Sequence, residues 1–395
     1  MPGPRSGRLR RVLRGDADEA RLRVVRLATE SFRNLAPLDL PIDAQFVVLH
    51  GPNAQGKTNA LEVVHLVATL KPLRGRKVRE LVRFGDKTAA VGARVVHAGV
   101  DRWLRVDLQA ERRIASLDGK PVGDLREYFA CVRAIAFTPT DGEIVTGEPA
   151  RRRNWLDRAV FTANPGHLDR VRAVRRVLDQ KAAVLRSERP EAAVLDVLDD
   201  ELARLGGDLV DRRARMLAEL APHVEDLHAT IAVGAVAPED AVPAALSLGL
   251  HTQAPGVDPS SRAQALRDKL AQSRDRELAR RATRVGPQLD DVRIGIDGRP
   301  ARDFGSRGQV RSIVLALKLA EMAAARIRGE VPLFLVDDVS SELDAARTAR
   351  LVTALGSLGA QVFATTTDPR PLFDALPAAD TLGIRVDGGR LEPGA

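Results

Sequence analysis

The stretch Gly51-Pro-Asn-Ala-Gln-Gly-Lys-Thr58 constrains the fold more than any other part of this sequence. It follows an apolar run, Phe46–His50, that is typical of a buried strand, and it precedes a helix-like run, Asn59–Ala68. A strand, the pattern G-x-x-x-x-G-K-[ST] and a helix, in this order, form a P-loop. The N–H groups of such a loop and the N-terminus of its helix bind phosphate groups. The sequence therefore predicts an α/β fold with a nucleotide site at this loop.

The loop and the start of its helix supply the first candidate residues. We expect Lys57 to reach the β- and γ-phosphates and to be needed for catalysis. The hydroxyl of Thr58 is expected to bind Mg²⁺, which prefers oxygen ligands and keeps several of its waters. ATP and Mg²⁺ are therefore the predicted cofactors. The predicted nucleotide-binding residues of this segment are Gly51, Pro52, Asn53, Ala54, Gln55, Gly56, Lys57, Thr58 and Asn59.

Two carboxylates form the second part of the predicted site. The apolar run Val331–Val336 leads directly into Asp337 and Asp338. A carboxylate at the end of a buried strand is where a Walker B acid helps to hold Mg²⁺. We therefore assign Asp337 to the metal, through its hydration shell, and Asp338 to the attacking water, and we count both as catalytic. The alternative, a solvated pair at a strand end, is disfavoured because the same chain carries a P-loop.

The charge of the chain indicates a polyanionic partner. There are 61 Lys and Arg residues against 53 Asp and Glu, which gives a net charge of +8. Aromatic residues make up only 3% of the chain, so few rings are present to stack on unpaired bases. DNA that contains duplex, including junctions of duplex with single strands, is the expected ligand, bound through its phosphates. The alternative is that the arginines are only solvated surface charge.

Composition argues against several other classes of protein. Cys131 is the only cysteine, which excludes an intrachain disulfide and a multi-cysteine metal site. No apolar stretch approaches the roughly 18 residues of a membrane-spanning helix. The arginines near the N-terminus are not followed by the apolar region of a secretory signal. We therefore expect a cytoplasmic protein with no membrane partner.

The pattern of apolar residues divides the chain into four parts. Residues 1–20, rich in arginine, are expected to be a disordered basic tail. Residues 21–147 are expected to form the first part of an ATPase lobe, with the P-loop, and residues 285–395 its second part. The helical period between them predicts a helical lobe at 148–284, which is too short for long coiled-coil arms because each helical residue rises only about 1.5 Å.

Short strands are expected ahead of the P-loop strand, at the start of a mixed sheet. Apolar residues recur there in brief runs, as in strands. The runs are Leu22–Leu27, Phe32–Leu35 and Leu38–Ile42.

A short polar motif, Ser306-Arg-Gly-Gln309, opens the helix that precedes the carboxylate strand. On its own such a serine is typical of any helix N-cap. Its position before Asp337, with Ser341-Glu-Leu-Asp344 directly after, resembles the signature motif, Walker B motif and D-loop of ABC-type ATPase heads. The resemblance implies that Ser306, Gly308 and Gln309 of one subunit close over the γ-phosphate held by another. ATP would then join two copies of the chain.

Six stretches narrow the resemblance within that superfamily. They are Phe32-Arg-Asn34, Asn53-Ala-Gln-Gly-Lys-Thr-Asn59, Arg151-Arg-Arg-Asn-Trp-Leu-Asp157, Asp297-Gly-Arg-Pro300, Leu315-Ala-Leu-Lys-Leu-Ala-Glu321 and Asp337-Asp-Val-Ser-Ser-Glu-Leu-Asp344. Together they resemble the RecF family of bacterial recombination and gap-repair ATPases. The resemblance implies an α/β fold: an ABC-type P-loop ATPase head with a mixed sheet, an inserted α-helical lobe and no long coiled coil.

The same resemblance implies partners and a mechanism. RecF proteins form an ATP-dependent homodimer, bind DNA, hydrolyse ATP slowly as a switch, and act with RecO and RecR to load RecA at single-strand gaps. This sequence departs from the family at Gln288 and Leu289, where a His-Arg pair is usual. The role of that pair is therefore in doubt here.

Two other functions stay open at this stage. One is an ATPase subunit of another machine, such as a membrane transporter. The helical insertion and the lack of a histidine in Thr365–Asp368, where transporter ATPases carry their switch histidine, disfavour it. The other is a scaffold that binds ATP with negligible hydrolysis.

Overall fold

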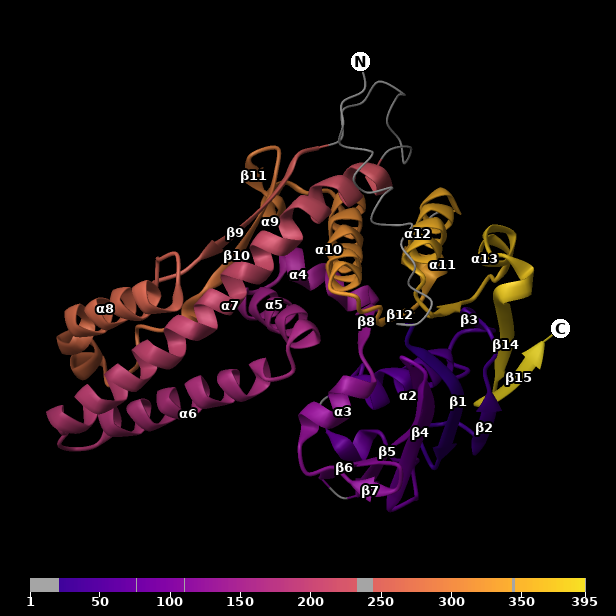
Figure 1. Ribbon diagram of the computed structural model, residues 1–395, viewed down its shortest axis with the longest axis horizontal. Helices are drawn as coiled ribbons and strands as arrows, with labels where there is room; N and C mark the ends of the chain where they lie inside the picture. The colour runs from indigo at the N-terminus through magenta and orange to yellow at the C-terminus, as the bar shows by residue number, and fades with distance from the viewer. Residues whose placement is uncertain (1–20, 76, 110, 233–243, 343–344, 395) are drawn as a thin grey trace. The chain divides into compact units, whose positions relative to one another are not determined.

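Figure 1 shows the computed structural model of the chain, which describes residues 21–75, 77–109, 111–232, 244–342 and 345–394. The chain forms two units. Among the described residues, the first comprises those within 21–141, 227–232 and 315–394, and the second comprises 142–226 and 244–314. The expected basic tail, residues 1–20, lies outside the described residues. The domain boundaries at 147/148 and 284/285 stay a prediction.

A mixed sheet of six strands carries the P-loop in the first unit. In spatial order its strands are β15 (Arg390–Gly394), β14 (Thr381–Asp387), β3 (Phe46–His50), β13 (Val362–Thr366), β12 (Leu333–Val336) and β8 (Ala134–Phe137). All neighbours are parallel except the hairpin of β14 and β15. Every residue of β12 and β13 is buried, which explains their continuous apolar sequences. The carboxyl ends of β3, β13 and β12 meet at one edge, where ligands bind in open α/β sheets.

The strands that precede the P-loop belong to a different, antiparallel sheet. Its order is β2 (Leu38–Pro41), β1 (Arg23–Glu30), β4 (Thr88–His97), β5 (Val100–Gln109), β6 (Arg112–Leu117) and β7 (Lys120–Pro121). Because every pairing in this sheet is antiparallel, the prediction that these strands start a mixed sheet was wrong. Burial along β1 largely alternates, as expected for an antiparallel sheet with one solvated face.

The strand predicted at Phe32–Leu35 was also wrong. Ser31 and Arg33 have φ angles of 50° and 51°, in the left-handed region that an extended strand cannot use. Only an isolated bridge joins Phe32 to Val82. The segment is a tight turn, and this turn brings Asn34 next to the P-loop.

Helices cover the sheets of the first unit. They are α2 (Lys57–Thr69), α3 (Leu125–Cys131), α11 (Val339–Glu342), α12 (Ala345–Leu358) and α13 (Arg370–Ala375), with 3₁₀ turns at Val78–Glu80, Pro139–Gly142 and Ala378–Asp380. The P-loop helix α2 is buried around most of its circumference. It is fixed in part by the hydroxyl of Tyr128, which donates to the Val67 carbonyl at 2.9 Å. In the part of the chain that the structure describes, no helix is long and apolar enough to cross a membrane.

The second unit is mainly helical. It contains α4 (Glu143–Thr146), α5 (Pro149–Ala163), α6 (His167–Arg186), most of α7 (Ala192–Ala232), α8 (Pro259–Arg280), α9 (Ala301–Phe304) and the start of α10 (Arg307–Ile327). A small sheet joins β11 (Arg299–Pro300), β10 (Asp291–Ile296) and β9 (Leu246–His251), and a 3₁₀ turn lies at Pro287–Leu289. The helices α6, α7 and α8 lie side by side (Figure 1) around a core that includes Val177, Leu202 and Leu266. They form a compact bundle, as predicted, and no extended coiled coil.

The Arg151–Asp157 stretch stabilises this second unit through buried ion pairs. Arg152 donates to both carboxylate oxygens of Asp291 at 2.7 and 3.0 Å. Arg213 does the same to Asp157, at 2.9 Å for each bond. Although burial raises the pKa of Asp157, hydrogen bonds from His167 and Arg213 lower it to about 2. Removing one partner of such a pair leaves a buried charge and typically costs about 3–5 kcal/mol.

Candidate nucleotide-binding site

The P-loop has the backbone that a phosphate-binding turn requires. Gly51 and Gly56 have φ angles of 147° and 110°, which other residues rarely adopt. A Cβ atom at Gly51 would lie 2.4 Å from the Val386 carbonyl oxygen, so a side chain does not fit there. Ala54, at φ 64°, is left-handed without being glycine. This strained loop needs support from its surroundings to keep its shape.

Lys57 lies folded back over this loop. It is the first residue of α2, only 8% of it is exposed, and its Nζ donates to the carbonyl oxygens of Gly51 and Pro52, both at 2.7 Å. Burial lowers the pKa of Lys57, while the carboxylates of Asp338 and Asp337 act in the opposite direction. A buried ammonium that donates to neutral carbonyl oxygens is suited to bind an anionic phosphate.

Asp337 connects the P-loop to the predicted Walker B strand. Its Oδ1 accepts from the hydroxyls of Thr58 and Thr365, both at 2.8 Å, and its Oδ2 accepts from Arg74 Nη2 at 2.6 Å. The carboxylate is fully buried. Thr58 is the second residue of α2, and Thr365 is the next-to-last residue of β13, the strand between β3 and β12. The structure thus places Thr58 and Asp337 in direct contact, while their role as magnesium ligands stays a prediction.

These groups fit a magnesium ion that is shared with a nucleotide. A threonine hydroxyl and a buried carboxylate are hard oxygen donors, and Mg²⁺ in such sites takes its other ligands from water and phosphate. Thr58 and Asp337 are the residues that would hold it. When bound, the ion would neutralise charge on the β- and γ-phosphates. Arg74 balances the charge of the Asp337 carboxylate in the structure described here.

Asp338 is only partly buried, unlike Asp337. Its φ angle is 58°, and its N–H donates to Thr365 Oγ1 at 2.7 Å. Ser340 Oγ lies 3.4 Å from its Oδ1 and 2.9 Å from Thr367 Oγ1. The left-handed backbone turns the chain immediately after β12, so that consecutive carboxylates have different surroundings. This arrangement is consistent with the two different roles predicted for them.

We expect Asp338→Asn to bind ATP normally but to hydrolyse it at least about 100-fold more slowly, the usual scale for loss of a general base. Asparagine tolerates the left-handed region, so the fold is retained. ATP-bound dimers should consequently last longer. Single-turnover hydrolysis measures the effect, with Asp43→Asn, the same change at a fully exposed position between β2 and β3, as control. Hydrolysis at the parent rate would place the catalytic carboxylate elsewhere.

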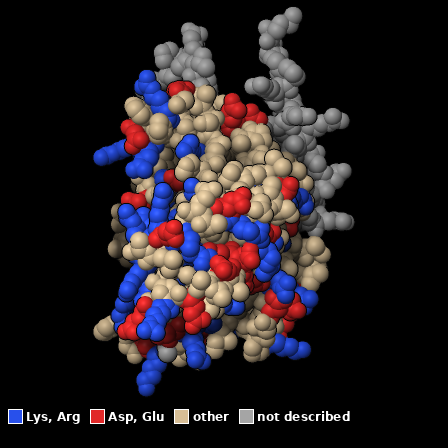
Figure 2. Space-filling view, turned by 90° about the vertical axis from the view of Figure 1, so that its left-hand side faces the viewer, with Lys and Arg blue, Asp and Glu red and all other residues tan. Residues whose placement is uncertain are grey.

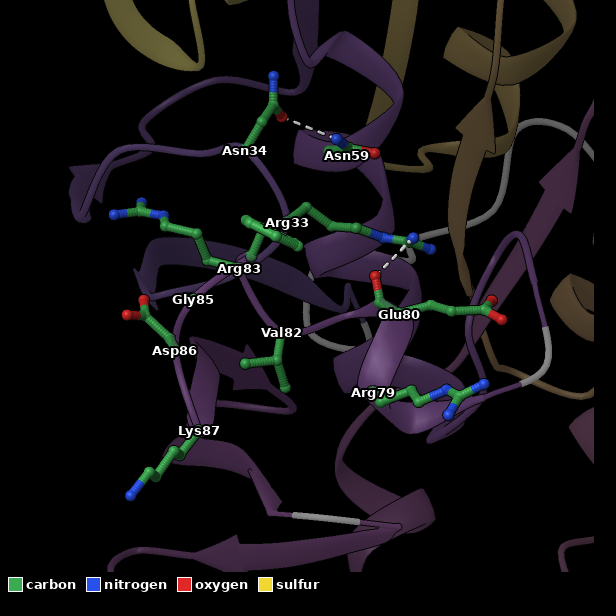
Figure 3. A pocket seen from close by; sticks show the side chains of 11 residues that line it. Arg33, Asn34, Asn59, Arg79, Glu80, Val82, Arg83, Gly85, Asp86 and Lys87 are labelled. Atoms are coloured by element: carbon green, nitrogen blue, oxygen red, sulfur yellow. Dashed lines mark hydrogen bonds between the residues drawn. The ribbon is translucent and has the colours of Figure 1, made fainter.

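Asn59 faces an open pocket beside the P-loop helix. Its Nδ2 donates to Asn34 Oδ1 at 2.7 Å, as Figure 3 shows. The pocket has a volume of about 650 Å³, and Phe84 is fully exposed at its rim. Its lining residues are Arg33, Asn34, Asn59, Arg79, Glu80, Val82, Arg83, Phe84, Gly85, Asp86 and Lys87.

Sequence analysis did not identify the residues that hold Arg74 in place. Arg33 forms an ion pair with buried Glu62 at 2.9 Å and donates to the Arg74 carbonyl oxygen at 3.1 Å. Glu62 Oε1 in turn accepts from the N–H groups of Leu73 and Arg74 at 2.9 and 3.1 Å. The basic loop after α2 was visible in the sequence, but nothing in its pattern showed which arginine would face Asp337.

The predicted signature residues lie in the second unit. Ser306 Oγ accepts from the Gln309 N–H at 3.2 Å, and Gln309 Oε1 accepts from the Ser306 N–H at 2.9 Å. This is a reciprocal capping box at the start of α10. Gly308 lies in the first turn of the same helix. The N-cap role is therefore present, while a role for Ser306, Gly308 and Gln309 toward a nucleotide stays a prediction.

Gln288 and Leu289 stand where the family usually has a His-Arg pair, and the structure shows what each of them contacts. Gln288 donates to the Val285 carbonyl oxygen at 3.2 Å. The side chain of Leu289 is 47% exposed. Neither residue supplies a charge at this position.

Comparison with known proteins establishes the family. The family described as RecF/RecN/SMC N terminal domain matches residues 23–386. "DNA replication and repair protein RecF" of Myxococcus xanthus is 39% identical over 372 residues, which cover 94% of this chain and 97% of that protein. The protein of the same description from Geobacter sulfurreducens is 38% identical, and the matching region covers 98% of that protein.

Solved structures show the same fold. A structure described as "recombination mediator protein RecF-ATP in RecFOR pathway" matches 95% of this chain and all of that one, with a TM-score of 0.83 at 24% identity. An Smc head domain from Pyrococcus furiosus matches with a TM-score of 0.54 at 12% identity. These matches, with the mixed sheet and the helical bundle, confirm the ABC-type ATPase head. On this evidence of sequence and fold, the chain belongs to the RecF family.

Proposed function

We propose that this chain is an ATP-dependent DNA-binding protein of recombinational repair and replication-gap repair. The observation that carries the proposal is the contact of Thr58 with Asp337, which joins the P-loop to the Walker B carboxylate at one sheet edge. ATP and Mg²⁺ are its proposed cofactors, and slow hydrolysis through Asp338 is the proposed switch.

The proposed partners follow from relatives. Similar proteins are described as acting in DNA replication and repair, and a structure of similar fold as acting in the RecFOR pathway. We therefore propose that this chain forms an ATP-dependent homodimer and acts in the cytoplasm with RecO and RecR to load RecA at gaps in DNA. Family membership and the lack of a switch histidine disfavour the transporter ATPase alternative.

The exposed face of α6 is our proposed contact for the DNA backbone. Arg172, Arg175, Arg176 and Arg186 are exposed and fall within about 100° of arc on a helix of 3.6 residues per turn, opposite the buried Lys181. One acidic residue, exposed Asp179, lies within the same arc. Arg175 and Arg176 form no ion pair with any residue that the structure describes. Figure 2, viewed from the side on which these helices are drawn in Figure 1, shows basic and acidic side chains interspersed. Binding should therefore depend on individual arginines, not on one broad basic area.

We expect binding to duplex DNA to weaken steeply with salt, because log affinity falls by about 0.9 per log unit of salt for each phosphate neutralised. The double variant Arg175→Glu/Arg176→Glu should bind more weakly. The slope of its log affinity against log salt concentration should be shallower than that of the parent protein by about 2. Fluorescence anisotropy of a labelled duplex at several salt concentrations measures both quantities.

The control for this prediction is Arg112→Glu/Arg113→Glu. It makes the same change in net charge at two adjacent, exposed arginines, on β6 of the first unit. If both double variants lose affinity equally, net charge alone controls binding and the α6 face is not the contact. If the affinity of the parent protein for duplex DNA does not change with salt concentration, the electrostatic account itself is contradicted.

The remaining alternative is a scaffold that binds ATP with negligible hydrolysis. Turnover measured with and without DNA separates it from the proposed switch. We expect slow turnover that DNA stimulates, and turnover indistinguishable from that of Asp338→Asn would favour the scaffold.

A further inference from the structure

The hairpin of β14 and β15 ends in a turn that is bonded directly to the P-loop. The N–H of Gly388 donates to Gln55 Oε1 at 2.8 Å, and the N–H of Gly389 donates to the Gln55 carbonyl oxygen at 2.9 Å. Both glycines have positive φ angles, 53° and 80°, as in a two-residue hairpin turn. Residues 333 positions apart in sequence are thereby joined at the phosphate-binding loop.

The same turn is locked to the segment on the other side of the loop. The Gly389 carbonyl oxygen accepts from the Ala36 N–H at 2.9 Å. A Cβ atom on Gly389 would lie 2.0 Å from the Asn34 carbonyl oxygen, so the two backbones are in close contact. Asn34 reaches the P-loop as well, because its Nδ2 lies 3.4 Å from the Gln55 carbonyl oxygen.

This contact lies where the P-loop is strained. Ala54 and Gly56, the neighbours of Gln55, both have left-handed backbones, and such conformations persist only when the surroundings hold them. Gly51, at the other end of the loop, lies against the Val386 carbonyl oxygen of β14. One hairpin thus supports both ends of the loop.

We infer that Gln55 and the Gly388–Gly389 turn form a brace that holds the P-loop in its phosphate-binding shape, with Gln55 as a positioning residue. The inference rests on the proposed binding of ATP. It adds the turn between β14 and β15 to the structural elements on which that binding depends. Because coupling between two sites is reciprocal, nucleotide bound to the loop must also stabilise the turn.

Two neighbouring glycines provide a matched test. Gly389→Ala places a methyl group against the Asn34 carbonyl oxygen, so the turn must move, and we expect ATP affinity to fall about 10-fold or more. Gly388→Ala introduces the same residue at another positive φ, but nothing lies within 4 Å of its Cβ. It should stay within about 2-fold of the parent. Titration of a fluorescent ATP analogue measures the affinities, and denaturant unfolding measures the stability of each variant.

Gln55→Met keeps the length of a partly exposed side chain and removes the acceptor for Gly388, which should weaken ATP binding about 3- to 10-fold. Gln55→Glu keeps an acceptor. Hydrogen exchange of a peptide covering residues 382–391 should be fast in Gln55→Met and slow in Gln55→Glu. In the parent protein it should slow further when ATP is added.

Two results would overturn the brace: parent-like ATP affinity in both Gly389→Ala and Gln55→Met, or exchange of the 382–391 peptide that does not respond to saturating ATP. If Gly389→Ala fails to fold, Gln55→Met and the exchange data decide the question. A parent protein that does not bind ATP would instead overturn the proposed function, and this inference with it.

Discussion

We expect Ser306→Arg to bind ATP as tightly as the parent protein and yet to remain a monomer when ATP is present. In an ABC-type head the signature serine acts on nucleotide held by the partner subunit, so Ser306 would meet the partner's phosphate and not its own. An arginine at that position would obstruct the closing interface. Sedimentation velocity with ATP, under conditions that block hydrolysis, measures the loss of the dimer.

The capping box found at Ser306 requires its own control. Losing the N-cap alone costs about 1 kcal/mol of stability, whatever its role toward ATP. Asp258 is the N-cap of the capping box that opens α8, so Asp258→Arg removes an equivalent cap from the same unit. We expect both variants to lose similar stability, while only Ser306→Arg loses the dimer. If the Ser306→Arg protein still dimerises with ATP, Ser306 acts only as a helix N-cap.

Lys57→Met should weaken ATP binding by about 10- to 150-fold, the range expected when hydrogen bonds to a charged group are lost. The fold should survive. The methionine fills the buried site without a charge, and burial already disfavours the ammonium, as the lowered pKa of Lys57 shows. The P-loop carbonyls of Gly51 and Pro52 lose a donor but remain beside solvent at the loop.

Direct titration of labelled ATP tests this prediction. Lys120→Met, the same change in the exposed turn region of β6 and β7, serves as the control and should bind like the parent. Unchanged affinity in Lys57→Met would mean that the P-loop is not the nucleotide site.

The sequence predicted those parts of the site that are indicated by a pattern of neighbouring residues. An apolar strand before the P-loop and another before Asp337 are both visible as continuous buried runs. Because parallel strands of one sheet end at the same edge, Thr58 and Asp337 could be expected to meet. In the structure the two side chains are 2.8 Å apart, and their role at a metal ion stays a prediction.

The parts that were missed depend on contacts between residues far apart in the chain. Arg74 and Asp337 are 263 positions apart, and no periodicity indicates that they pair. Thr365 reaches Asp337 only because β13 lies between β3 and β12, and this strand order is not encoded in any single motif. The turn at Phe32–Leu35 was mistaken for a strand because its two apolar residues fit a strand, while the left-handed backbone of Arg33 is not indicated by the pattern.

The central claim is that ATP, bound at Lys57, controls DNA binding. The most direct test is the affinity for one labelled duplex, measured by anisotropy with no nucleotide, with ADP and with ATP, for the parent protein and for Lys57→Met. We predict that ATP tightens binding by the parent protein relative to ADP and to no nucleotide, and that Lys57→Met shows the same weak affinity in all three conditions. Equal affinity of the parent protein in all three conditions would contradict the account.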